Sequence, residues 1–335
     1  MVKLFSEKEI KKLWKRLKKY PNVVGFDSLP QPRIKQGKEV PNTSTLRIYV
    51  TRKVSIQELK PKEVIPRKLD LGSKEIETDI VEIGEIKALQ DTKKRYRPIK
   101  AGISGCHMSC TACTISGFFQ DKETGRVLVG LNNHCGALEN KAKKGDPWVQ
   151  PSPYDKGIYP KDEMAHLHHF VEIKFNGFNC PFRNFFHKIY RTLKRDVPMN
   201  KVDISFGVPV VDFEITSLGI PNAFSGYREP EVGDEVQKTG RTTGYTRGKI
   251  ISTSWTGSVQ YSRGIAVFTD CIVVEGKGFS AGGDSGSPVF DMDGNLVGIL
   301  FAGSDTHTIL CKIKNIEEEG NVRVVTKKDL RLDKR

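Results

Sequence analysis

The sequence predicts a small α/β module followed by a larger, mainly β domain. One capped amphipathic helix is followed, up to about residue 88, by a few β-branched segments. After Gly102, short apolar segments alternate with glycine-rich or Asp-Gly turns, a pattern typical of a barrel or a sandwich. The 335 residues fit one large domain or two of ordinary size.

The first predicted element is a helix over residues 6–20. Ser6 and Glu9 have the spacing of a capping box, and Pro21 ends the segment. Four apolar residues recur at helical spacing among lysines: Ile10, Leu13, Trp14 and Leu17. A basic amphipathic helix can lie on a membrane. Such a stripe more often packs on the rest of the protein, and we favour that interpretation.

The rest of the N-terminal module, residues 1–88, is predicted to contain short strands. Three segments are β-branched or alternate in polarity: 23–26, 45–54 and 78–86. Residues 89–101 are charged and carry no periodicity, which predicts a linker.

The second domain, residues 102–335, is predicted to be β throughout. Candidate strands are 111–119, 126–131, 201–208, 248–255, 265–274 and 295–303. The interval 152–200 breaks this rhythm with HLHHF and a basic aromatic stretch, so we interpret it as a partly helical insertion.

The segment FSAGGDSGSPVF, residues 279–290, predicts a nucleophilic serine. Ser285 lies in a glycine-rich turn that leads directly into an apolar strand. A serine hydroxyl needs a base beside it to attack at neutral pH. It also needs backbone N–H groups aimed at the developing oxyanion, and flanking glycines allow that turn geometry.

Two further segments supply candidate partners for Ser285. His134 follows an apolar strand in LVGLNNHCGA, residues 128–137, and Asp203 lies between apolar neighbours in KVDISFGV, residues 201–208. Asp196 and Asp212 are alternatives, but the flanks of Asp203 fit a buried carboxylate best. The order His, Asp, Ser is the one used by chymotrypsin and not by subtilisin or the α/β-hydrolases.

These motifs resemble those of the trypsin-like serine endopeptidases. GDSGSPVF is similar to the nucleophile motif, with Ser287 where a second glycine is usual, and NNHC is similar to the histidine motif. VQKTGRTTGYTRGKI, residues 236–250, resembles a segment of alpha-lytic-type proteases. The resemblance covers about residues 102–315. The N-terminal module, with its Val-Gly strand, IPRKLD and TDIVE, is similar to the one that precedes the protease domain in microbial and plant narrow-leaf-type proteins.

The resemblance implies a chymotrypsin-like double β-barrel with His134, Asp203 and Ser285 at the barrel junction. It assigns the oxyanion hole to the N–H groups of Gly283 and Ser285. It places Phe279 at the base of the substrate pocket and a cleft strand with Phe301, Ala302 and Gly303 beside it. Because an acidic pocket base selects Arg or Lys, Phe279 predicts no preference for basic residues. Phe301 stands where a serine is usual, which removes one expected polar contact.

The resemblance also raises the question of activation. Many family zymogens mature by exposing an Ile-Val N-terminus, and Gly102-Ile103 is only a weak equivalent. Either no such step is needed or residues 1–100 act as a pro-region that assists folding or covers the cleft.

The seven cysteines allow more than one interpretation. The resemblance implies a disulfide between Cys113 and Cys135. Cys106, Cys110 and Cys113 with His107 could alternatively hold zinc, but structural zinc sites with such short spacings normally take a ligand from a distant part of the chain. His166, His168 and His169 could bind a metal with Cys180, since His-x-His is a known ligand spacing, but nothing completes a recognisable site. We therefore expect no metal and no organic cofactor.

Composition limits the partners and the location. The net charge of +14 favours anionic partners, but no nucleic-acid-binding motif accompanies it, so no specific nucleic acid is expected. No stretch is long enough for a membrane span, and the absence of a secretory signal pattern favours the cytoplasm. Protein or peptide substrates are expected. A non-catalytic binding protein on a protease scaffold and an esterase with the same triad are the alternatives. Oligomeric state is not predicted.

Overall fold

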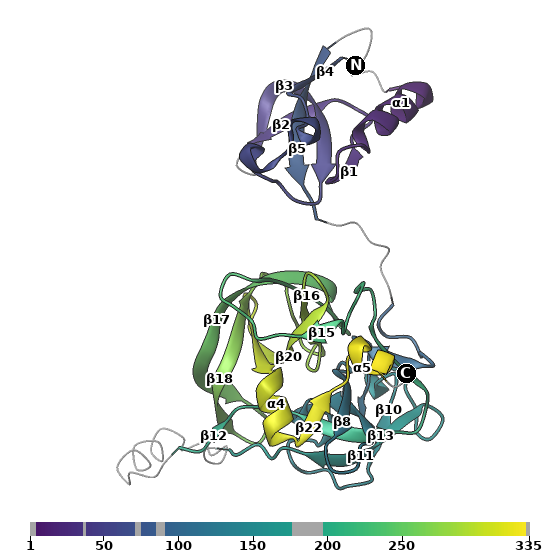
Figure 1. Cartoon of the computed structure of the whole chain (residues 1–335), viewed down its shortest axis with the longest axis vertical. Coiled ribbons are helices and arrows are strands. Elements are labelled where there is room, and N and C mark those ends of the chain that lie inside the picture. The colour runs from purple at the N-terminus through teal and green to yellow at the C-terminus, as the bar shows by residue number, and fades with distance from the viewer. Residues whose placement is uncertain (1–4, 36–37, 71–74, 85–90, 176–196, 333–335) are drawn as a thin grey trace. The chain divides into compact units, whose positions relative to one another are not determined.

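The computed structural model describes residues 5–35, 38–70, 75–84, 91–175 and 197–332. The chain forms two compact units, residues 1–89 and 90–335 (Figure 1). Within the described residues, no helix is long and apolar enough to cross a membrane.

The N-terminal unit packs one helix on a five-stranded sheet. Its elements are α1 (Glu7–Leu17), β1 (Val23–Phe26), β2 (Gln31–Lys35), β3 (Lys38–Val50), β4 (Lys68–Asp70) and β5 (Glu75–Glu82), with short 3₁₀ turns at Ile56–Glu58 and Pro61–Glu63. The strand order is β1-β3-β5-β4, with β2 paired to β3. The predicted capping box is confirmed, since the Glu9 carboxylate accepts from the Ser6 N–H at 2.7 Å and the Ser6 hydroxyl accepts from the Glu9 N–H. The helix buries Leu13 and Leu17 in the core of this unit.

The second unit begins with a seven-stranded sheet of order β22-β8-β9-β13-β11-β10-β7. Its strands are β7 (Cys106–His107), β8 (Gly117–Asp121), β9 (Val127–Leu131), β10 (Pro147–Val149), β11 (Glu163–Phe170), β13 (Ser205–Pro209) and β22 (Val322–Val324). A short helix, α2 (Asn133–Gly136), follows β9 directly. Because β22 comes from the end of the chain, the C-terminal segment completes the sheet that β8 begins.

The second sheet contains a closed ring of six strands. They are β16 (Glu235–Gly240), β17 (Gly244–Gln260), β18 (Ile265–Glu275), β19 (Pro288–Asp291), β20 (Asn295–Gly303) and β21 (His307–Lys312). The ring closes because β21 pairs with both β18 and β20, while β16 links β17 to β19. Its interior holds a compact apolar cluster that includes Phe279 and Leu310. The predicted mainly β class is confirmed.

Minor elements complete the second unit. They are β6 (Ile99–Ala101), a 3₁₀ turn (Pro153–Asp155), β12 (Met199–Asn200), β14 (Phe213–Ser217), β15 (Gly226–Tyr227), α4 (Ile313–Glu319) and α5 (Lys327–Leu332). The β6 strand pairs with β14, and β12 and β15 extend the second sheet at its ends.

Two predicted boundaries are wrong. The interval 89–101 is not a linker beyond residue 90, because Thr92 is buried with its hydroxyl on the Arg241 carbonyl at 2.7 Å, and β6 belongs to the second unit. The interval 152–200 is not wholly an insertion, since β11 is a strand between β10 and β13. The polar and histidine residues of β11 hid its strand character in the sequence. The basic aromatic stretch falls on residues 176–196, outside the described residues.

Candidate active site

His134 and Asp203 form a closely bonded pair. His134 lies in α2, and Asp203 is fully buried two residues before β13. The Nδ1 atom of His134 is 2.6 Å from Oδ2 of Asp203, and the backbone N–H of His134 donates to Oδ1 at 3.2 Å. The second contact fixes the carboxylate relative to the backbone as well as the ring. The imidazole is therefore held in one orientation, and its Nε2 makes no hydrogen bond to the part of the chain that the structure describes.

Tyr261 makes a third contact with this carboxylate, which the sequence did not reveal. Its hydroxyl, just after β17, donates to Oδ2 of Asp203 at 2.8 Å. Its ring lies edge-on to His134, with centroids 5.9 Å apart. Phe301, which stands where a serine is usual in the family that the sequence resembles, is buried, and its ring packs on Phe268 with centroids 4.6 Å apart. Tyr261 thus supplies a polar contact to the carboxylate that Phe301 cannot make.

The electrostatics of the pair favour a protonatable base. Burial lowers the pKa of His134, but the charge of Asp203 and its hydrogen bond outweigh burial, so the pKa lies above its ordinary value. Burial beside Asp203 raises the pKa of Tyr261 well above its ordinary value, so the phenol stays protonated and remains a donor.

Ser285 lies in a turn before β19 that two glycines shape. The glycines on either side of the Asp284-Ser285 pair have positive φ angles, +94° at Gly283 and +96° at Gly286. A Cβ added to Gly286 would lie 2.0 Å from the carbonyl oxygen of Thr114, so only glycine fits there. The N–H of Thr114 donates to the Ser285 carbonyl at 2.8 Å, which ties the turn to the segment before β8.

Between Gly283 and Ser287, two N–H groups are without acceptors among the described residues. They belong to Gly283 and Ser285, whereas the N–H groups of Asp284, Gly286 and Ser287 all donate to backbone carbonyls. Each of these N–H groups shares its peptide with a carbonyl group that accepts a hydrogen bond. Gly282 O accepts from the Thr242 hydroxyl at 2.7 Å. Asp284 O accepts from the Ser287 N–H and hydroxyl, the latter at 2.6 Å.

This anchoring sets the direction of both N–H groups, because the C=O and N–H of one peptide point in opposite directions. They are the two groups that the resemblance assigned to the oxyanion hole. The hydroxyl of Ser287, absent from the usual family motif, is used to hold one of them.

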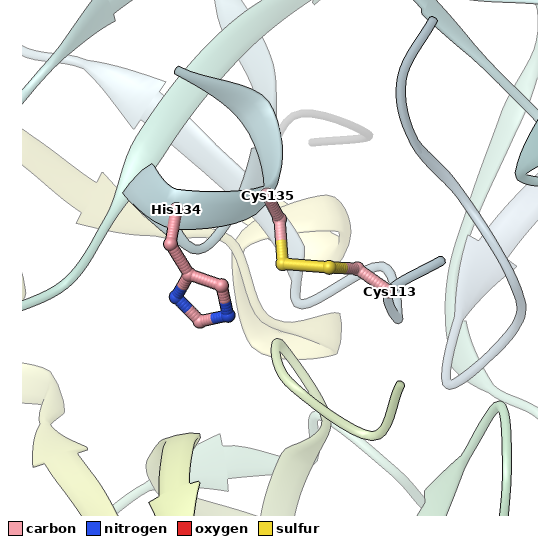
Figure 2. Close-up of side chains that lie close together, drawn as sticks. All are labelled: Cys113, His134 and Cys135. Atoms are coloured by element: carbon pink, nitrogen blue, oxygen red, sulfur yellow. A yellow bond between two sulfur atoms is a disulfide. The ribbon is translucent and has the colours of Figure 1, made fainter. Parts of the chain in front are cut away.

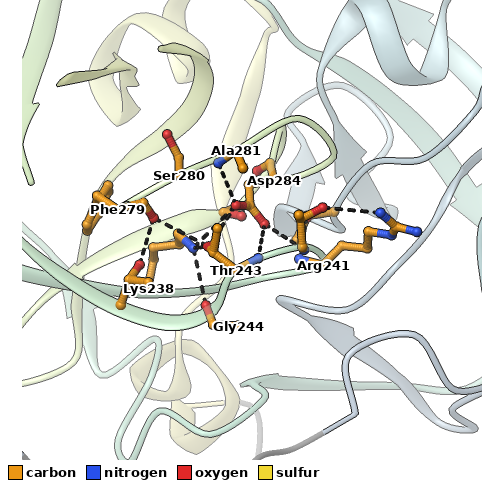
Figure 3. A network of polar contacts seen from close by, with 12 residues as sticks. Lys238, Arg241, Thr243, Gly244, Phe279, Ser280, Ala281 and Asp284 are labelled. Atoms are coloured by element: carbon orange, nitrogen blue, oxygen red, sulfur yellow. Dashed lines mark hydrogen bonds and ion pairs between the residues drawn. The ribbon is translucent and has the colours of Figure 1, made fainter. Parts of the chain in front are cut away.

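The carboxylate of Asp284 holds the turn in place through a network of buried hydrogen bonds (Figure 3). Its Oδ1 accepts from the Thr242 N–H at 2.8 Å, and its Oδ2 accepts from the Thr243 hydroxyl and the Ala281 N–H at 2.7 and 2.9 Å. Lys238 on β16 places Nζ 3.7 Å from Oδ2, with both side chains fully buried. Burial lowers the pKa of Lys238 to about 8, against the charge of Asp284. The carboxylate therefore already has an internal cation as its partner.

A disulfide connects the serine and histidine segments. The structure joins Cys113 to Cys135, the pair that the resemblance implied, and Cys135 directly follows His134 (Figure 2). Because Thr114 follows Cys113 and binds the Ser285 backbone, one covalent bond and one hydrogen bond link the two segments. No hydrogen bond joins the Ser285 side chain to His134 among the described residues; such contacts often tighten only with substrate.

The remaining candidates lie in varied surroundings. Phe279 and Phe301 are buried in core clusters, while Ala302 is half-buried and Gly303 is exposed at the end of β20. Asp212 lies in the turn before β14, and Asp196 and Cys180 fall outside the described residues. The alternative zinc set of three thiolates is not assembled, because Cys113 is in the disulfide, although Cys110 Sγ lies 3.9 Å from Cys113 Sγ.

Comparison with known proteins gives no match to a family model or to a curated protein. Solved structures that align with this chain include Thermobifida fusca Protease A and a Nocardiopsis protease, each 18% identical with a TM-score of 0.45. These alignments cover 68% of this chain and 98% and 99% of the other chains. Cellulomonas bogoriensis chymotrypsin is 16% identical over the same share, also with a TM-score of 0.45.

Proposed function

We propose that this protein is a serine endopeptidase, with Ser285 as nucleophile, His134 as general base and Asp203 as the group that orients the base. The observation that carries the proposal is the pairing of a buried carboxylate with His134, on a segment linked through the disulfide to a serine turn with two free N–H groups. Each component has the role that acyl transfer requires of it.

The proposed reaction proceeds by acyl transfer. Oγ of Ser285 attacks the peptide carbonyl carbon while Nε2 of His134 takes the hydroxyl proton. The N–H groups of Gly283 and Ser285 donate to the carbonyl oxygen as it becomes negative. Collapse breaks the C–N bond, and His134 passes its proton to the leaving amine. Water then repeats the sequence on the acyl-enzyme, releasing the acid and restoring the serine.

The network beneath the turn supports activity without a new N-terminus. The Asp284 carboxylate accepts from three backbone N–H groups and one hydroxyl, and Lys238 supplies the opposite charge. We propose that no proteolytic step is needed to order the oxyanion hole.

Labelling with a fluorophosphonate probe tests the proposal. Folded wild-type protein should be labelled at Ser285, and labelling should be lost in Ser285→Ala and His134→Ala but retained in Ser254→Ala, which alters an exposed serine of β17. Loss of either triad member should lower kcat by about 10⁴–10⁶. Folded wild-type protein that resists the probe would favour the non-catalytic scaffold.

Substrate profiling separates the remaining possibilities. Matched peptides and esters should show peptide turnover, whereas turnover of esters alone would indicate an esterase. A peptide library should show no preference for Arg or Lys before the cleaved bond, because the resemblance places Phe279 and no carboxylate at the pocket base. Strict cleavage after basic residues would contradict this assignment.

A further inference from the structure

A second cluster of polar side chains lies where strands β8 and β11 of the seven-stranded sheet end, and it takes no part in the proposed acyl transfer. It consists of Asp121 at the end of β8 and His168 and His169 in β11. One carboxylate oxygen and one ring nitrogen from each histidine lie within 4.8 Å of one another. Carboxylate and imidazole together are ligands that zinc and its neighbours bind in proteins.

A break in strand register explains how two successive histidines reach the same place. Side chains of adjacent strand residues normally point to opposite faces. Along β11, however, Leu167 pairs with Gly207 and His169 with Phe206, so His168 is the extra residue of a bulge. The two Nδ1 atoms are consequently 2.7 Å apart. Two nitrogens on one tetrahedral zinc ion lie about 3.3 Å apart, so a small separation of the rings would admit the ion.

His169 is held as a metal ligand usually is. Its Nε2 lies 2.9 Å from the carbonyl oxygen of Gly320, at the end of α4. Since a carbonyl only accepts, Nε2 must carry the proton, and Nδ1 presents its lone pair to the cluster. A backbone carbonyl that fixes the tautomer and direction of a histidine is the common support of protein metal ligands. The ring also packs on Phe206, with centroids 4.9 Å apart.

Asp121 has one oxygen engaged and one available. Its Oδ1 accepts from the N–H and hydroxyl of Thr124, at 2.7 and 2.8 Å, and from the N–H of Glu123 at 3.1 Å. All three contacts fall on the same oxygen and close the turn between β8 and β9. The side chain is only 6% exposed, so its charge is poorly hydrated. Oδ2 is the atom left to bind a cation.

We propose that Asp121, His168 and His169 bind a divalent first-row transition ion such as Zn²⁺, through Oδ2 and the two Nδ1 atoms, with water in the fourth position. Binding replaces the hydrogen bond between the two rings, and His168 then carries its proton on Nε2. The ion would join the end of β8 to β11 and, through His169, to the end of α4. Among the described residues, none of the three ligands makes a hydrogen bond with His134 or Asp203, so the ion would act apart from the proposed acyl transfer.

Titration of the full-length, metal-free protein with CoCl₂ and ZnCl₂ tests the site. Co²⁺ should give the visible bands of a tetrahedral site with nitrogen and oxygen ligands, saturating at one equivalent. It should not give the intense near-ultraviolet bands of thiolate ligation, which would instead indicate the cysteines. Zn²⁺ should displace Co²⁺ and raise the thermal midpoint of the wild type.

Matched variants locate the ions. His168→Gln and Asp121→Asn should each weaken the affinity for Zn²⁺ by about tenfold to a hundredfold. Asparagine can still accept from Thr124 and preserve the turn, so Asp121→Asn reports on the site even if His168→Gln folds poorly. His166→Gln, which changes a histidine of the same strand outside the cluster, should bind as the wild type does. No saturable binding by wild type, or equal weakening in His166→Gln, would overturn the proposal.

Discussion

The residue with the most informative position is Tyr261, because its hydroxyl shares Oδ2 of Asp203 with the His134 ring. Tyr261→Phe removes a donor from the carboxylate, whose charge then stabilises the imidazolium more strongly. We expect the acid limb of the kcat/KM profile to move to higher pH by about 0.5–1 unit, with kcat several-fold lower.

Tyr227→Phe is the matched control, since Tyr227 is an exposed tyrosine in β15. It should leave the profile unchanged. A Tyr261→Phe enzyme with a wild-type acid limb would show that the hydroxyl does not act on the base.

Thr242 carries a second residue-scale prediction. Its hydroxyl holds the Gly282 carbonyl and thereby directs the Gly283 N–H. Thr242→Val keeps the shape of the side chain and removes that bond, so kcat should fall about tenfold with KM little changed. This is less than the 10²–10³ lost when an oxyanion donor is removed outright. Thr256→Val, on an exposed part of β17, provides the same substitution without that contact. Equal loss in both variants would argue against the anchoring role.

Local sequence could indicate some site residues and not others. The apolar flanks of Asp203 identified a carboxylate that is indeed fully buried. Tyr261 could not be found in the same way, because it contacts Asp203 only after β17 has crossed the sheet. The separation of the two in the sequence carries no periodic pattern. The sequence likewise singled out His168 and His169 as candidate metal ligands but could not associate them with Asp121, which lies far from HLHH in the chain.

At the scale of elements, β16 and the serine turn are joined by the buried Lys238–Asp284 pair. Because burial lowers the pKa of Lys238 to about 8, the folded state releases this proton at lower pH than the unfolded chain, whose lysine keeps a pKa near 10.5. Between these values the unfolded state binds more protons, so the contribution of this group to the unfolding free energy rises with pH.

Urea unfolding across that window measures the effect. From pH 8 to 10.5, the wild type should gain about 2–3 kcal/mol relative to Lys238→Met, which cannot titrate. Lys249→Met, at an exposed position on β17, should follow the wild-type curve. A constant difference between wild type and Lys238→Met at all pH values would mean that Lys238 does not titrate there.

Elements were predicted best where their sequence pattern is strong and local. The helix α1 has its cap and its apolar stripe within a few turns, and it begins where expected. The β11 strand was mistaken for part of an insertion because half of its residues are polar or histidine. Its place is set by pairing with β10 and β13, which no local pattern records.

For the molecule as a whole, the class of fold follows from the spacing of short apolar strands, whereas ring closure does not. Closure depends on β21 pairing with two partners at once, and only the three-dimensional structure shows it. The domain boundary was also placed too late in the chain. Charge between residues 91 and 97 suggested a solvated linker, but Arg97 is half-buried and donates to the Gln150 side chain at 2.7 Å.

The corrected boundary gives a prediction about truncation. A chain of residues 91–335 retains three contacts. They are the hydrogen bond from Thr92 to the Arg241 carbonyl, the one from Arg97 to the Gln150 side chain, and the packing of the fully buried Ile99 of β6. A chain beginning at Ala101 loses all three. From one buried aliphatic side chain and several hydrogen bonds, we expect it to be less stable by about 3–6 kcal/mol.

Urea unfolding of both chains beside the full-length protein measures this difference, and fluorophosphonate labelling of each reports whether the site is assembled. The 91–335 chain should unfold cooperatively and label at the full-length rate if the N-terminal unit neither assists folding nor covers the cleft. Faster labelling on removal of residues 1–90 would identify the N-terminal unit as a cover, and poor folding would identify it as a pro-region. Equal stability of the two truncated chains would show that residues 91–100 do not belong to the core of the second unit.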